Sequence, residues 1–147
     1  MSPATGSRVA KKKAADALFA CGAMGDGSAI RVTGSTLYAP LDARIEAIPE
    51  TGYEIMLRSA AGLKLWIRIG ASTHHLMGEK CQRLVCVGDE VAAGSPLMNI
   101  NPIWLKSKGI EPICMVTVRN TKSLRALVPA NNMRLVALED PLYDVYW

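Results

Sequence analysis

The sequence is poor in aromatic side chains and histidine, and it has no long apolar segment. Aromatic residues make up only 5% of its 147 residues, with one phenylalanine and two histidines, His74 and His75. No run of about 18 apolar residues is present to cross a bilayer. The N-terminal residues also lack the apolar core of a secretion signal. We therefore expect a soluble, cytoplasmic protein without membrane insertion.

The charge pattern argues against nucleic-acid binding. The chain carries a formal charge of +4 and has a sequence pI near 9.0, but its only basic cluster is short and consists of Arg8 and residues 11–13. A nucleic-acid surface normally combines a larger basic patch with aromatic side chains on which bases stack. We expect no nucleic-acid partner.

The four cysteines form no C-x-x-C pair. In a cytoplasmic chain such cysteines are most often small buried side chains. A zinc site built from Cys81, Cys86, His74 and His75 has suitable ligand types, but its spacing matches no familiar zinc motif. Two adjacent histidines also lack the H-x-H arrangement of lysostaphin-type metallopeptidases. We expect no metal and no cofactor.

Short segments with β-strand patterns dominate the chain. Alternating or β-branched residues between glycine-containing turns predict strands at 30–32, 44–48, 55–57 and 63–69. Helices are predicted only at 101–108 and 121–127. Within 147 residues this pattern predicts one all-β domain, a small β-sandwich or barrel with a few short helices.

The sequence also repeats weakly within itself. Residues 2–6 and 39–43 both place a proline among small residues at the expected start of a strand. Residues 87–97 have the V-G-D-x-V-x-x-G-x-x-L pattern of a hairpin shared with lipoyl and biotinyl carrier domains, and residues 24–27 carry a related Gly-Asp turn. The expected fold therefore includes an internal duplication, a feature that specifies architecture and not chemistry.

One predicted strand separates a core face from an outward face. Between Leu63 and Ile69 the odd-numbered residues are aliphatic, whereas the even-numbered ones are Lys64, Trp66 and Arg68. Successive side chains of a strand point to opposite faces, so Trp66 and Arg68 are expected to point outward. Arg68 is then either an ordinary exposed arginine stacked on Trp66 or a neighbour, or part of an anion-binding or protein-docking site.

Several segments match a known family pattern in order and spacing. Residues 65–73 read L-W-I-R-I-G-A-S-T and residues 50–55 read E-T-G-Y-E-I. They resemble the L-F-V-H-F-G-I-D-T strand and the E-T-N-H-A-F segment of glucose-type enzyme IIA domains, which belong to the bacterial phosphoenolpyruvate:sugar phosphotransferase system. Weaker similarities in the same order lie at 2–6, 16–20, 24–30, 38–42, 76–79 and 115–120. The resemblance implies an enzyme IIA-like domain at 1–128, and residues 129–147, which match no part of the pattern, are expected to form a C-terminal extension.

The resemblance implies that both reacting positions have changed. Family members use two facing histidines to carry and support the phosphoryl group, and Tyr53 and Arg68 stand at these positions. A phosphoryl relay needs a neutral nitrogen nucleophile near pH 7, which imidazole supplies. A guanidinium stays protonated, and a phenol with a pKa of about 10 is only about 0.1% ionised at pH 7. We expect no catalytic residue at either position.

Other site positions of the family are partly kept. The resemblance matches Asp26 to one of two rim aspartates, while Ser72 replaces the other. Thr51 and Thr73 match site threonines whose hydroxyl groups can orient an anion. Because complementary charge mainly sets encounter rate and partner choice, docking of the carrier protein HPr is expected to be weak.

These features support three functional hypotheses. We favour a catalytically inactive, regulatory homologue of enzyme IIA, not an enzyme, that binds a transporter, kinase or regulator. A small anion is a second candidate ligand. The binding residues would be Asp26, Thr51, Tyr53, Trp66, Arg68 and Thr73, with Tyr53 as the hydrogen-bond partner of Arg68. An alternative is a functional sugar-transport component that uses His74 or His75 as its phosphoryl acceptor. The third hypothesis is a structural domain that oligomerises through the apolar tail at 135–138 and 142–147.

Overall fold

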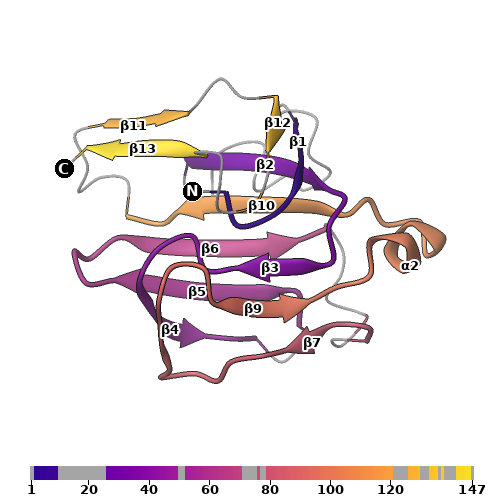
Figure 1. Cartoon of the computed structure of the whole chain (residues 1–147), viewed down its shortest axis with the longest axis horizontal. Helices are drawn as coiled ribbons and strands as arrows, with labels where there is room; N and C mark the ends of the chain where they lie inside the picture. The colour runs from indigo at the N-terminus through magenta and orange to yellow at the C-terminus, as the bar shows by residue number, and fades with distance from the viewer. Residues whose placement is uncertain are drawn as a thin grey trace.

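The computed structural model describes residues 2–9, 26–49, 52–70, 76, 79–120, 126–129, 133–135, 137 and 142–146. Antiparallel strands dominate this part of the chain (Figure 1). The strands are β1 Gly6–Val9, β2 Asp26–Val32, β3 Thr36–Tyr38, β4 Ala43–Ala47, β5 Glu54–Ser59, β6 Lys64–Ile69, β7 Gln82–Arg83, β8 Glu90–Val91, β9 Pro96–Asn99, β10 Ile113–Val118, β11 Ala126–Pro129, β12 Arg134–Leu135 and β13 Tyr143–Tyr146, and the helix is α2 Pro102–Ser107. Each predicted strand coincides with one of these, so the predicted all-β class is confirmed.

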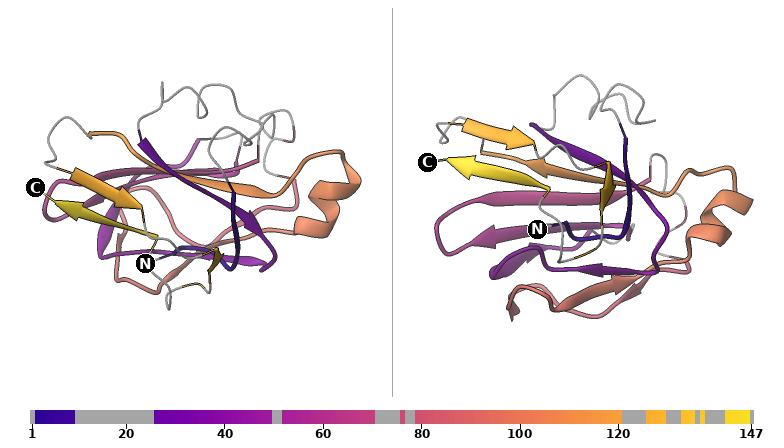
Figure 2. Two further views of the ribbon diagram at one scale, coloured as in Figure 1. Left: turned by 90° about the horizontal axis from the view of Figure 1, so that it is seen from above. Right: turned by 45° about the horizontal axis from the view of Figure 1, so that its top comes forward.

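The strands form three antiparallel sheets. The largest has eight strands in the order β12-β1-β2-β10-β6-β5-β4-β8. A second sheet has the order β3-β9-β7, and β11 pairs with β13 to form the third. In Figure 1 the strands β3 and β9 overlap the large sheet and run roughly along β5 and β6, and Figure 2 shows the molecule from two further directions. The two strands belong to a separate layer, the β3-β9-β7 sheet. The architecture is therefore a sandwich.

The main hydrophobic core lies between the eight-stranded sheet and the β3-β9-β7 sheet. Leu57 and Ile67 contribute from the large sheet, while Leu37 and Leu97 contribute from β3 and β9, and all four are at most 1% exposed. Burial of an aliphatic side chain of this size is worth about 1.5–3 kcal/mol. The same core includes Ala4 near the N-terminus and Leu142 near the C-terminus. Both ends of the described chain therefore contribute to one cluster of side chains.

The predicted alternation in β6 is confirmed. Leu65, Ile67 and Ile69 are buried on the core side, whereas Trp66 and Arg68 lie on the opposite face. That face is only partly open to solvent, because Trp66 packs against a small second cluster formed by Ala29, Ile113 and Met115.

The two segments with related sequences lie close together. The backbone amide of Tyr38, just before residues 39–43, donates to the carbonyl of Pro3 at 2.9 Å. The carbonyl of Ala39 in turn accepts from the amide of Gly94, in the hairpin at 87–97, at 2.9 Å. Pro3 and Pro40 each lie three residues before a strand, β1 and β4, and neither is the donor in these contacts.

The predicted helix at 101–108 is confirmed, with α2 covering Pro102–Ser107. Asn101 caps it, since its side-chain oxygen accepts from the amide of Trp104 at 3.0 Å. Proline suits the first turn, and Gly109, with φ +76, ends the helix.

The second predicted helix is wrong where the structure describes it. Ala126 and Leu127 belong to β11 and pair with Tyr146 and Val145 of β13, while residues 121–125 lie outside the described part. Pairing with a strand far along the chain outweighs local helix propensity, which amounts to only a few tenths of a kcal/mol per residue.

The described residues after position 128 include segments that pack onto the sandwich. β12 pairs with β1 through Gly6 and Leu135, and Leu135 and Leu142 are 1% and 2% exposed within the main core. Two of the leucines that the oligomerisation hypothesis places at a contact between chains are therefore buried within this chain. In the part of the chain that the structure describes, no helix is long and apolar enough to cross a bilayer.

Truncation of Leu135 tests whether the tail is part of the cooperative fold. We predict that Leu135→Ala lowers the free energy of unfolding by about 2–4 kcal/mol, because it leaves a cavity in the core. Met133→Ala, two residues away and 68% exposed, is the matched control and should change stability by less than about 0.5 kcal/mol. Urea denaturation measures both, and equal effects would show that the tail is not packed as described.

Candidate functional site

The outward face of β5 and β6 carries a nearly buried ion pair. Glu54 and Arg68 are directly opposite each other in the antiparallel register of these strands. Arg68 Nε lies 3.1 Å from Glu54 Oε1, and the two side chains are only 15% and 16% exposed. Charges that are largely removed from water interact more strongly than surface pairs and are costly to separate. The pair therefore holds opposite charges close together on this face of the sheet.

The interpretation of Arg68 as an exposed arginine stacked on Trp66 is wrong. A different arginine takes that place, since the guanidinium carbon of Arg119 lies 4.8 Å from the centre of the Trp66 ring. Such cation–π contacts favour the protonated guanidinium that arginine always provides. The Trp66 indole nitrogen is buried, and it has no hydrogen-bond acceptor among the described residues.

Tyr53 lies in the turn that leads into β5, and its side chain points into the core. It is 0% exposed, and its hydroxyl donates to the backbone carbonyl of Glu79. The predicted hydrogen bond from Tyr53 to Arg68 is therefore absent, because the phenol and the guanidinium lie on opposite sides of the sheet. Gly52 and Tyr53 both have a positive φ, +71 and +60, a conformation that non-glycine residues rarely adopt.

Burial governs the ionisation of this phenol. The pKa of Tyr53 is raised to about 12, chiefly by loss of solvent and to a smaller extent by the nearby Cys81 and Glu79. Burial also raises the pKa of the Cys81 thiol. Both effects disfavour the anionic form, so Tyr53 is a neutral hydrogen-bond donor at physiological pH.

Of the remaining predicted site residues, Asp26 has a described backbone, and it lies away from Arg68. Asp26 pairs with Val118 in β10, whereas Arg68 pairs with Met115 of the same strand. The two positions are therefore on either side of β10 and offset by about 10 Å along it. The side chain of Asp26 and the residues Thr51, Ser72, Thr73, His74 and His75 lie outside the described part.

Two of the four residues in the zinc hypothesis are described. Cys81 is half-buried, with its sulfur 3.8 Å from the Met98 sulfur, and Cys86 is exposed. No group of three or more His, Cys, Asp or Glu side chains that is able to hold a metal occurs among the described residues. The cysteine contact is ordinary sulfur packing.

Sequence reasoning missed Glu54 as a residue of this site. A signal was available: this chain has glutamate at position 54, whereas the family segment that residues 50–55 resemble has alanine at that place. Gly62 permits a tight turn between β5 and β6, with φ +95, and that turn sets the register that places residue 54 opposite residue 68. A carboxylate directly opposite a guanidinium in an antiparallel pair is a favourable combination.

Comparison with known proteins agrees with this architecture. The family described as "phosphoenolpyruvate-dependent sugar phosphotransferase system, EIIA 1" matches residues 1–124. The chain belongs to this family. The glucose permease IIA from Mycoplasma capricolum shares the fold, with a TM-score of 0.81 and 22% identity over 97% of this chain and 91% of that one.

Curated relatives of the enzyme IIA family include single-domain and multidomain proteins. The chain is 29% identical over 144 residues to the glucose-specific EIIA component of Staphylococcus aureus, covering 98% of this chain and 87% of that protein. It is 35% identical over 127 residues to the glucose-specific EIIBCA component of Corynebacterium glutamicum, covering 86% of this chain. The chain spans only about a fifth of the length of such multidomain relatives.

The buried phenol predicts a stability effect at high pH that Tyr53→Phe isolates. In the unfolded chain the Tyr53 pKa returns to its ordinary value near 10, so between pH 10 and 12 only the unfolded state releases this proton, and stability falls as pH rises. We predict that the variant is about 1 kcal/mol less stable at pH 7, where the hydrogen bond to Glu79 is lost. The difference should shrink above pH 10.

Urea denaturation of both proteins from pH 7 to 11 measures this change. The other tyrosines titrate in both proteins, so their contributions cancel in the difference. A difference that stays constant across this range would mean that the phenol is not buried.

Proposed function

We propose that this chain is an enzyme IIA-type module that does not carry a phosphoryl group and acts by binding a protein partner. The observation that carries the proposal is the Glu54–Arg68 ion pair at the position where the family resemblance places an acceptor histidine. A guanidinium has no free lone pair to attack a phosphoryl group. The positive charge of Arg68 is also paired with the Glu54 carboxylate within the sheet.

The residue at the second histidine position supports the same conclusion. Tyr53 is fully buried, and its hydroxyl is engaged by the carbonyl of Glu79. With a pKa of about 12, on the order of one phenolate in 10⁵ is present at pH 7. Nucleophilic catalysis needs either an adjacent base or a lowered pKa, and Tyr53 has a raised one.

Binding without transfer is consistent with the surface that remains. Trp66 and Arg119 form a stacked pair on the outward face next to Arg68, and aromatic and arginine side chains are the most frequent anchors of protein interfaces. The multidomain relatives are named for joined A, B and C components. We propose that a transporter of this system, a kinase or a regulator is the partner, in the cytoplasm, and that HPr docks weakly because Ser72 lacks a carboxylate.

Incubation with phosphoenolpyruvate, enzyme I and HPr tests the proposal directly. We predict that the chain acquires no acid-labile phosphoryl label under conditions in which the glucose-specific EIIA component of S. aureus is labelled stoichiometrically. The reason is that neither Tyr53 nor Arg68 offers a nucleophilic nitrogen. Intact-mass spectrometry before and after mild acid treatment measures the modification.

The double variant His74→Ala/His75→Ala tests the competing hypothesis, in which His74 or His75 accepts the phosphoryl group. Label on the wild type that disappears in this variant would establish a relocated acceptor and overturn the proposal. Label that persists in this variant and is stable to acid would indicate a phosphate ester elsewhere, and this would also contradict the proposed lack of a phosphoryl group.

A further inference from the structure

Four cations form a continuous row across the large sheet, away from the Glu54–Arg68 pair. Arg44 in β4 is directly opposite Arg58 in β5, and Arg58 is directly opposite Lys64 in β6. Arg119, which follows β10, donates its backbone amide to the Lys64 carbonyl at 2.8 Å and so continues the row. All four residues are exposed.

Repulsion within this row of cations lowers the stability of the folded chain. Like charges directly opposite each other in an antiparallel pair are destabilising. Among the described side chains compensation is partial: Glu46 lies 3.7 Å from Arg58, and Glu90 is opposite Arg44 in the sheet register. Four cations against two carboxylates leave a surplus of positive charge on this strip.

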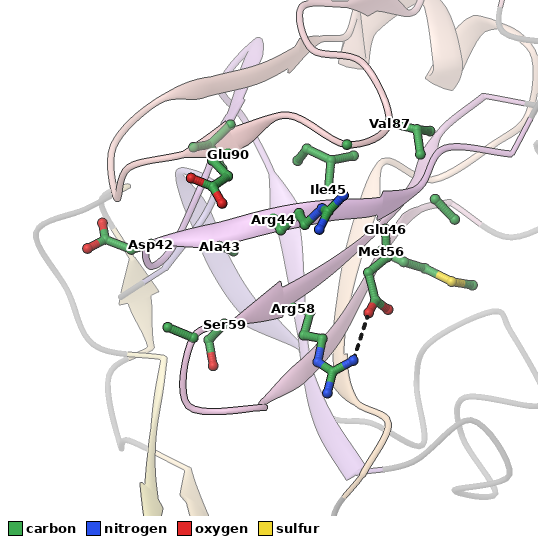
Figure 3. Close-up of a pocket in the computed structure, with 14 residues that line it drawn as sticks. Asp42, Ala43, Arg44, Ile45, Glu46, Met56, Arg58, Ser59, Val87 and Glu90 are labelled. Carbon is green, nitrogen blue, oxygen red and sulfur yellow. Dashed lines mark ion pairs between the residues drawn. The ribbon is translucent and has the colours of Figure 1, made fainter.

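The β4–β5 half of the row lines a concave surface. A cavity of about 850 Å³ is bounded by Arg44, Arg58 and Glu46 together with apolar atoms of Met56 and Val87. Figure 3 shows the two arginines extending from neighbouring strands, with Arg58 paired to Glu46 at the rim. The cations are therefore presented in a hollow that a partner segment can enter.

The spacing of the row selects one kind of partner. Neighbouring strands are about 4.8 Å apart, so the row spans about 14 Å. Side chains three and four residues apart on a helix lie about 5–6 Å from each other along one face. In an extended chain, same-side residues repeat at about 6.7 Å. The cation spacing is closer to the helical repeat.

We propose that this cationic row is a docking site for an acidic α-helix of a partner protein. Carboxylates at every third or fourth position of such a helix would each meet one cation of the row. Glu46 and Glu90 disfavour a continuous phosphate backbone, and nucleic-acid binding typically involves more phosphate contacts than four cations supply. The site is independent of the proposed loss of phosphoryl transfer, because Lys64 is about 13 Å along β6 from Arg68.

Titration by NMR tests the proposal on the full chain. The probe is an alanine-based, end-blocked helical peptide with glutamate at every fourth position, added at low ionic strength, where surface charges are least screened. We expect shifts at Arg44, Arg58, Lys64 and Arg119 and at the indole of Trp66, which lies beneath Arg119. Arg44→Ser/Lys64→Ser should weaken binding about tenfold.

Matched controls make each outcome decisive. Arg83→Ser/Arg134→Ser removes the same charge from exposed residues of β7 and β12 and should leave the affinity within about twofold. Arg44 and Lys64 are each opposite Arg58, while Arg44 is also opposite Glu90. Because these effects on stability oppose each other, Arg44→Ser/Lys64→Ser should leave the urea midpoint nearly unchanged, so lost binding is not lost folding. Equal weakening by both double variants would show a general effect of net charge and overturn the proposal.

Two further results would also overturn it. One is equal affinity for a peptide of the same composition with its glutamates rearranged to alternate positions, because the helical spacing would then be irrelevant. The other is tighter binding of a single-stranded thymidine decanucleotide at the same salt concentration, because the row would then be a nucleic-acid surface.

Discussion

The ion pair between Glu54 and Arg68 is the interaction on which the functional interpretation depends. It joins two neighbouring strands of the large sheet on the face opposite the core, with both charges largely removed from water. A guanidinium in this environment remains a cation, and its carboxylate partner keeps it in place. Arg68 is therefore engaged in a contact between neighbouring strands of the sheet.

The second changed position is used in a different way. Tyr53 crosses to the core side, where it is fully buried and where its hydroxyl ties the turn before β5 to the backbone at Glu79. Tyr53 and Arg68 therefore both make contacts within the sandwich, one on each face of the sheet. The outward face carries charged and aromatic groups, with Arg119 stacked over Trp66.

Sequence reasoning predicted the parts of this fold that depend on local patterns. The alternation at 63–69 gave the correct faces of β6 because a strand between a core and an outward face must alternate. The helix at 101–108 was also predicted, and the structure shows the local features that favour it, the Asn101 cap and the proline in the first turn. Ala126 and Leu127 were misassigned because their structure depends on pairing with β13. The burial of Tyr53 and the contact of Arg68 with Glu54 were also missed, because both follow from the turn geometry and register, which alternation alone does not fix.

A double-mutant cycle on Glu54→Ala and Arg68→Ala tests the central claim most directly. The cycle isolates the energy of this pair from the other contacts of each residue, and we predict a coupling of about 1–3 kcal/mol from urea denaturation. The pair Glu46 and Arg58 is the matched reference, because it lies on the same sheet face at 3.7 Å but is 36% and 55% exposed. Its coupling should be about 0.2–1 kcal/mol. A coupling between Glu54 and Arg68 no larger than that of the exposed pair would contradict the account.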